Sequence, residues 1–218
     1  MQRRAFLLIA SAAGLAGGRA WAQTSIRPDP TPRLPPQPGQ GLPVDDRRFL
    51  REAGTLSAAQ AEAASRAAQA TTNEETRRFA TALAERHRGL AEQLSSLTRQ
   101  RGGPEAAQTA AAAPGPKVAR ALQRLAGLGQ TAAPGGSDPG REFLAAQLEV
   151  HPVLVEMYQA EASQTTDREL GRIAITALVG LQEDFATAAR LGEGYGLARP
   201  EGLLANPPQY GPGTGPAR

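Results

Sequence analysis

The sequence predicts an all-α protein, a bundle of four long helices with a long crossover between the second and third helices. Four stretches between Asp46 and Leu191 carry apolar residues at alternating steps of three and four, which is the spacing of amphipathic helices. Only a few residues separate the first stretch from the second and the third from the fourth, so each pair is expected to form an antiparallel hairpin. A long Ala-, Gly- and Pro-rich segment, 102–138, joins the two hairpins.

The first 22 residues have the pattern of a targeting segment. Arg3-Arg4 precedes an apolar run, and Ala20-Trp21-Ala22 supplies small residues at the cleavage positions. The paired arginines indicate a twin-arginine signal peptide, so we expect a periplasmic protein that begins at about Gln23. Glycines interrupt the apolar run, and a transmembrane helix is therefore not expected there.

Charge and cysteine content exclude two classes of function. The signal segment holds three of the 24 basic residues and no acid, which leaves 21 basic and 21 acidic residues in the expected mature chain. A neutral chain offers no concentrated basic face, so nucleic-acid binding is not expected. The sequence contains no cysteine, which rules out disulfides and thiol chemistry.

Composition divides the expected mature chain into three parts. Residues 23–44 hold seven prolines and are expected to form an extended, disordered tether. The four-helix bundle is expected over residues 45–191, and the Gly/Pro-rich residues 192–218 are expected to be a disordered tail. A periplasmic or envelope partner would be expected to bind through the tether or the tail.

The first hairpin is expected to pair a helix from about Asp46 to Ala70 with one from Thr72 to Arg101. Thr72 and Glu75 form a capping-box pattern at the start of the second helix, and Gly102-Gly103-Pro104 ends it. The inward stripes are Phe49, Ala53, Leu56, Gln60, Ala63 and Ala67 on the first helix, and Phe79, Leu83, His87, Leu90, Leu94 and Leu97 on the second.

The crossover is expected to contain one short helix at about 117–128 before the second hairpin. Asp138-Pro139 is a good cap and first-turn pair for the third helix, and Thr166 with Glu169 repeats the capping box for the fourth. The inward stripes are Leu144, Gln147, His151, Leu154 and Tyr158 on the third helix, and Leu170, Ala174, Ala177, Leu181, Asp184, Ala188 and Leu191 on the fourth.

Each long helix thus aims a polar residue into its apolar side: Gln60, His87, His151 and Asp184. A rise of about 1.5 Å per residue places these four at similar heights, which predicts a shared polar layer. Pro152 cannot donate a backbone hydrogen bond, so we expect a kink or bulge that frees the Leu148 carbonyl. This carbonyl would then either orient the imidazole of His151 or hold a water molecule.

The order and spacing of several motifs resemble an exported bacterial family, the domain of unknown function 4142. The similarity covers roughly Asp46 to Leu191 and includes the opening segment 46–53, Phe79-Ala80 followed by His87, and Gln147 with His151. This resemblance implies a ferritin-like fold. Relatives usually have Glu at position 60, Asp at 86 and His at 184, where this chain has Gln60, Arg86 and Asp184. The Glu-x-x-His pairs of di-iron bundles are absent, so ferritin-type iron oxidation is not expected.

Two interpretations of the polar layer remain open. In the first and preferred one, the protein is a non-catalytic binding or structural bundle, and Gln60 hydrogen-bonds with Asp184 or the imidazoles. In the second, His87, His151 and Asp184 hold a single zinc or iron ion, with Gln60 as a fourth inward polar residue. No nucleophile or base with a route to substrate is evident, so no catalytic residue is assigned.

Overall fold

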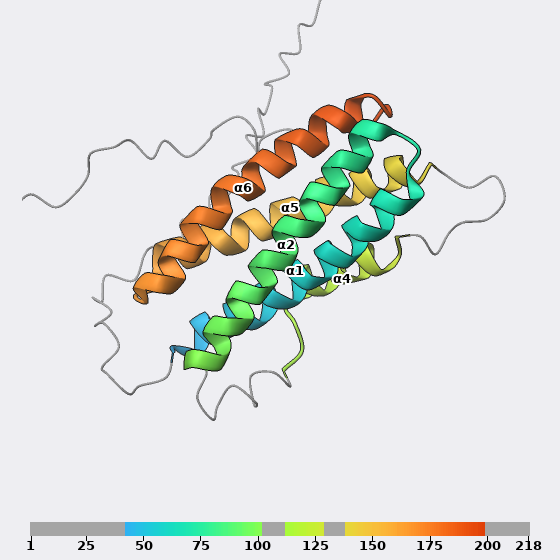
Figure 1. Ribbon diagram of the computed structural model, residues 1–218. Coiled ribbons are helices and arrows are strands. Elements are labelled where there is room, and N and C mark those ends of the chain that lie inside the picture. Colours follow the sequence, from blue (N-terminus) through green and yellow to red (C-terminus); the bar gives the residue numbers. More distant parts are fainter. Residues whose placement is uncertain (1–41, 102–111, 129–137, 199–218) are drawn as a thin grey trace, which may run out of the picture. The chain divides into compact units, whose positions relative to one another are not determined.

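The computed structural model describes residues 42–101, 112–128 and 138–198, all within one compact unit of the chain. Five helices and no strand occur in these ranges: α1 (Val44–Ala70), α2 (Glu74–Arg101), α4 (Pro116–Ala126), α5 (Pro139–Gln164) and α6 (Arg168–Glu193). The four long helices lie together, with the short α4 beside α1 (Figure 1). The predicted all-α fold class is therefore confirmed. The expected signal segment 1–22, most of the tether, and residues 199–218 of the tail lie outside the described residues.

Contacts at the helix ends establish the direction of each helix. The hydroxyl of Thr165, just after α5, donates to Asp46 at the start of α1 (2.8 Å), so α1 and α5 are antiparallel. Arg101 at the end of α2 donates to Glu169 at the start of α6 (2.7 Å), so α2 and α6 are also antiparallel. Because α1 and α2 form a hairpin, α2 and α5 run in the same direction. This is the bundle with one long crossover, as in ferritin-like folds.

The N-terminal caps agree with the sequence pattern at one helix and differ by one residue at two. Asp138 accepts from the backbone N–H groups of Gly140 and Arg141 at the start of α5, as predicted. At α2, however, the cap is Asn73 rather than Thr72. At α6 it is Asp167 rather than Thr166. Asn and Asp accept hydrogen bonds from the first turn more effectively than Thr, which explains both corrections.

The inward stripes predicted from helical spacing form most of the core. Every predicted position is buried except Leu90 and Ala177, which are half-buried. The ordered bundle also extends beyond the limits expected for it. Leu42 belongs to the core, and Tyr195 packs against the end of the bundle with its hydroxyl 3.2 Å from that of Thr76.

Helix α4 covers the side of the bundle formed by α1 and α5. Val118, Ala121 and Leu125 form its buried face. Glu52 on α1 accepts from the backbone N–H of Gly115 (3.0 Å), and Lys117 pairs with Glu156 on α5 (2.6 Å). Helix α4 is thereby held against the bundle and covers its α1–α5 side.

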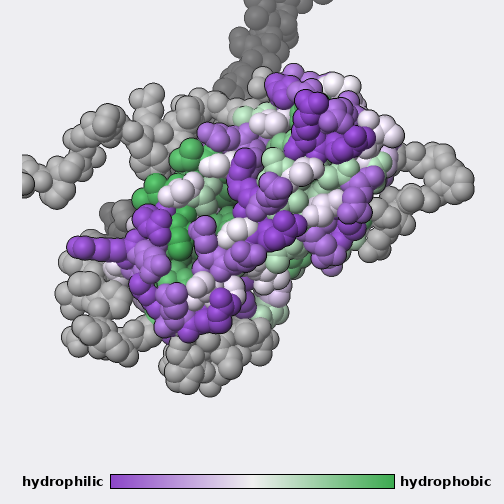
Figure 2. Space-filling view, viewed as in Figure 1, coloured by the Kyte–Doolittle hydropathy of each residue, from purple (hydrophilic) through white to green (hydrophobic). Residues whose placement is uncertain are grey.

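The face of the bundle seen in Figure 2 is mostly hydrophilic, with apolar residues gathered along part of α6. Among the described residues, the exposed large apolar side chains are Val44, Ile175 and Val179, of which the last two lie on α6. None of the described helices is both long and apolar enough to span a bilayer.

Candidate metal centre

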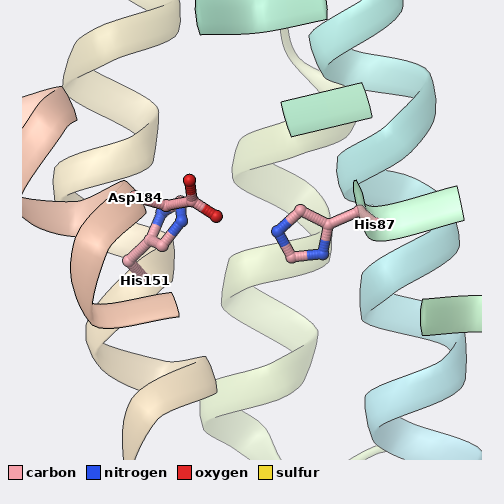
Figure 3. Close-up of side chains that lie close together, drawn as sticks. All are labelled: His87, His151 and Asp184. Carbon is pink, nitrogen blue, oxygen red and sulfur yellow. The ribbon is translucent and has the colours of Figure 1, made fainter. Parts of the chain in front are cut away.

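His87, His151 and Asp184 meet in the middle of the bundle, although they come from three different helices. His87 lies on α2, His151 on α5 and Asp184 on α6, and all three are buried. One potential ligand atom from each residue lies within 4.8 Å of the other two. Figure 3 shows the His87 ring reaching from one side toward Asp184 and His151. The ring centroids of the two histidines are 6.1 Å apart, so His151 points inward as predicted.

The orientation of His151 is fixed by its own helix. Its Nδ1 lies 3.2 Å from the backbone carbonyl oxygen of Gln147. Because a carbonyl can only accept, Nδ1 carries the proton and donates, which leaves a lone pair on Nε2. The expectation that the Leu148 carbonyl would orient this ring is wrong, because the Gln147 carbonyl does so. Helix α5 continues past Pro152, from Pro139 to Gln164.

Burial keeps both imidazoles neutral. Desolvation, with the nearby His151 and Arg86 contributing less, lowers the pKa of His87 to about 3. Desolvation also lowers the pKa of His151 to about 4, against an opposing contribution from the Gln147 carbonyl. A neutral imidazole is the form that binds a metal ion, so neither ring has to lose a proton at neutral pH to become a ligand.

Gln60 does not join the cluster. Its amide nitrogen donates to the Gln147 side-chain oxygen (2.8 Å), and the Gln147 amide nitrogen donates back to the Gln60 oxygen (3.2 Å). The prediction that Gln60 would hydrogen-bond with Asp184 or the imidazoles is therefore wrong. The sequence places Gln147 on the same inward stripe as His151, four residues earlier, but its pairing with Gln60 was not predicted.

Two charged residues from facing helices contact each other beside the imidazoles. Arg86 on α2 donates to Oδ1 of Asp184 on α6. Burial raises the pKa of Asp184, while the hydrogen bond and charge of Arg86 act in the opposite direction. The guanidinium thereby balances the carboxylate charge and occupies Oδ1, whereas Oδ2 is buried and accepts no hydrogen bond from the described residues.

Four buried polar atoms of the cluster have no hydrogen-bond partner within the described protein: Nδ1 and Nε2 of His87, Nε2 of His151 and Oδ2 of Asp184. The three residues each offer one ligand atom, and these atoms lie within 4.8 Å of one another. A single point can therefore lie at most about 2.8 Å from all three of them (4.8 Å divided by √3). Bonds from zinc to imidazole nitrogen or carboxylate oxygen are about 2.0–2.2 Å, so shifts of less than about 1 Å would complete a first shell.

A comparison with solved structures finds the same helical arrangement in another protein. The crystal structure of a DUF305 fragment from Deinococcus radiodurans superposes with a TM-score of 0.58 at 18% sequence identity. The match covers 71% of this chain and 98% of the fragment. At this level of identity the similarity concerns the fold alone. No curated protein matches the chain.

A comparison with family profiles matches residues 31–191 to one family. The matched segment holds all four long helices up to Leu191, and it includes His87, His151 and Asp184. The match spans well over half of the 218 residues. The chain therefore belongs to the family described as Domain of unknown function (DUF4142).

Proposed function

We propose that this protein is an exported, periplasmic four-helix bundle that binds one zinc or iron ion through His87, His151 and Asp184. The observation that carries the proposal is the group of unpartnered buried atoms that converge from three helices. Each buried polar atom without a partner costs about 1–3 kcal/mol. A metal ion would satisfy one atom of each residue at once.

The hydrogen-bond pattern favours this proposal over a purely structural polar layer. The structural interpretation depended on Gln60 as the donor that would satisfy the imidazoles and Asp184. Gln60 instead bonds with Gln147, and both amides are fully buried in that pair. No other described side chain bonds to either ring nitrogen of His87.

The donor set limits which ion would bind. Two imidazole nitrogens and one carboxylate oxygen suit Zn²⁺ with an open fourth position. The same two-histidine, one-carboxylate set also suits Fe²⁺ with open positions. Softer ions that select thiolate ligands are not favoured, because the chain has no cysteine.

Metal titration of the chelator-stripped protein tests this proposal. The wild type should bind one equivalent of Zn²⁺ or Fe²⁺ in isothermal titration, and His87→Gln, His151→Gln and Asp184→Asn should each bind far more weakly. The matched control is Gln60→Met, a buried polar residue outside the cluster, which should keep wild-type affinity. Equal affinity in all five proteins would show adventitious surface binding. A folded wild type that binds neither ion would contradict the metal site and favour the structural interpretation.

Export through the twin-arginine route is the second part of the proposal. It is supported by Arg3-Arg4 ahead of the apolar run and by the small residues 20–22. Replacing both arginines by lysine should abolish periplasmic accumulation, as followed by cell fractionation and immunoblotting. Replacing Arg19 by lysine is the matched control and should leave export intact. Unchanged export of the Arg3/Arg4 variant would contradict the assignment.

A further inference from the structure

Access to the three-residue cluster is restricted on every side of the bundle. His87 is 1% exposed, His151 0% and Asp184 4%. The helices of each hairpin pack closely against each other, while α2 and α6 pack much less extensively. The side opposite α2 and α6 is formed by α1 and α5, and there α4 and the buried Gln60–Gln147 pair intervene. The least closely packed route to the cluster therefore runs between α2 and α6.

Arg86 spans this route. Its side chain is 46% exposed, whereas that of Asp184, the residue to which it donates, is 6% exposed. The chain of Arg86 passes over Gly180, where an added Cβ would lie 3.6 Å from its Cδ. Arg86 thus starts on the solvent side of α2, crosses α6 at a residue without a side chain, and ends on a carboxylate of the cluster.

The charge of Arg86 also acts on the cluster. Its guanidinium bonds to Asp184, so it places a positive charge inside the cluster and opposes further positive charge there. A cation approaching between α2 and α6 would meet the same repulsion. Arg86 itself has no lone pair to offer a metal ion, because guanidinium only donates. Its effect on metal exchange would therefore be steric and electrostatic.

We propose that Arg86 is a gate through which a metal ion enters and leaves the site. This inference rests on the proposed metal-binding function. In the closed state the guanidinium bonds to Asp184 and covers the route. The gate opens when the side chain leaves Asp184 and extends into solvent, which its partial exposure permits. The closed contact slows entry and exit alike, so Arg86 controls the rates of exchange more than the affinity.

Stopped-flow exchange of Zn²⁺ tests the gate. Zn²⁺-loaded protein is mixed with excess 4-(2-pyridylazo)resorcinol to follow release, and chelator-stripped protein is mixed with Zn²⁺ to follow uptake. A hydrogen bond between charged groups favours the closed state over the open state by a factor of about 10 to 100 in population. Arg86→Ala should accelerate both release and uptake by about that factor, with a smaller change in Kd.

Three further variants separate the gate from other effects. Arg88→Ala removes an exposed arginine that lies two residues away, outside the cluster, and should keep wild-type rates. Gly180→Leu should displace the Arg86 side chain and accelerate exchange while Arg86 is retained. Gly180→Ala should not, because its Cβ would make ordinary van der Waals contact.

The outcomes distinguish the gate from the site. If Arg86→Ala exchanges Zn²⁺ at wild-type rates, the gate is wrong and the metal site stands. If release accelerates while uptake does not, Arg86 only holds Asp184 in position, and the gate is again wrong. If the wild type takes up no Zn²⁺, both the proposed function and the gate fail.

Discussion

Gln60 and Gln147 exchange two hydrogen bonds between α1 and α5, at 2.8 and 3.2 Å, in the fully buried centre of the bundle. The same Gln147 holds His151 through its backbone carbonyl. The amide pair therefore satisfies itself and borders the cluster, but leaves the free nitrogens of the imidazoles for another partner. This separation of the polar layer into an amide pair and a three-residue cluster is the basis of the functional proposal.

The amide pair should behave as one energetic unit. Gln147→Leu leaves the Gln60 amide buried without its partner and should lower the free energy of unfolding by about 1–3 kcal/mol. The double variant Gln60→Leu/Gln147→Leu removes both amides and should cost less than the sum of the single changes. Urea denaturation of the four proteins completes the cycle. Additive losses would mean that the two amides are not coupled.

A side chain at position 140 should destabilise the protein. A Cβ there would lie 2.7 Å from the hydroxyl oxygens of Thr71 and Tyr195 and 3.0 Å from Oδ1 of Asp138. Gly140→Ala should therefore destabilise the protein by about 1–3 kcal/mol, as measured by thermal unfolding. The control is Gly89→Ala within α2, where nothing lies within 4 Å. That change should stabilise by about 0.5–1 kcal/mol, and a similar loss at both sites would refute the packing argument.

Two leucines of the α2 stripe should differ in their contribution to stability. Leu83 is 0% exposed, and Leu83→Ala should cost about 2–5 kcal/mol. Leu90 is only half-buried, so Leu90→Ala should leave a smaller cavity and cost less. Chemical denaturation of the two variants measures the difference. A larger loss of stability in Leu90→Ala than in Leu83→Ala would mean that the inward face of α2 is assigned incorrectly.

The chelator-stripped protein should lose stability on acidification below pH 6.5. The pKa of His87 falls from 6.5 to about 3 on folding and that of His151 to about 4, so the unfolded chain binds more protons in this range. The free energy of unfolding should therefore fall as pH falls, by up to about 2.7 kcal/mol per pH unit when unfolding takes up two protons. The decrease should level off below about pH 3. The raised pKa of Asp184 acts in the opposite direction and offsets part of this loss.

Denaturation of His87→Gln/His151→Gln measures the contribution of the two imidazoles. The double variant should show a much shallower dependence between pH 6.5 and 4, because both titrating rings have been removed. Equal slopes in the wild type and the double variant would mean that the imidazoles are not buried in their neutral form.

Much of this fold follows from the sequence because helix spacing and connection lengths are local properties. The stripe containing Leu83 and His87 could be predicted from steps of three and four alone. The inward direction of His151 could be predicted in the same way. The caps at Asn73 and Asp167 were harder to place, because adjacent residues all had side chains able to accept a hydrogen bond.

The pairing of polar groups could not be predicted, because it depends on distances between helices. Gln60 had several candidate partners at similar height, and only the packing of α1 against α5 selects Gln147. The bond from Arg86 to Asp184 likewise joins residues 98 positions apart, and Arg86 lies outside the inward stripe of α2. Helical periodicity shows which side chains face inward, whereas contacts between helices determine which of them meet.

The metal content of the untagged protein, purified from its native compartment without chelators, tests the central claim most directly. We predict roughly one zinc or iron ion per chain by inductively coupled plasma mass spectrometry, and almost none in His87→Gln/His151→Gln prepared in the same way. A folded wild type that contains no stoichiometric metal and takes up neither ion when it is supplied would contradict the account.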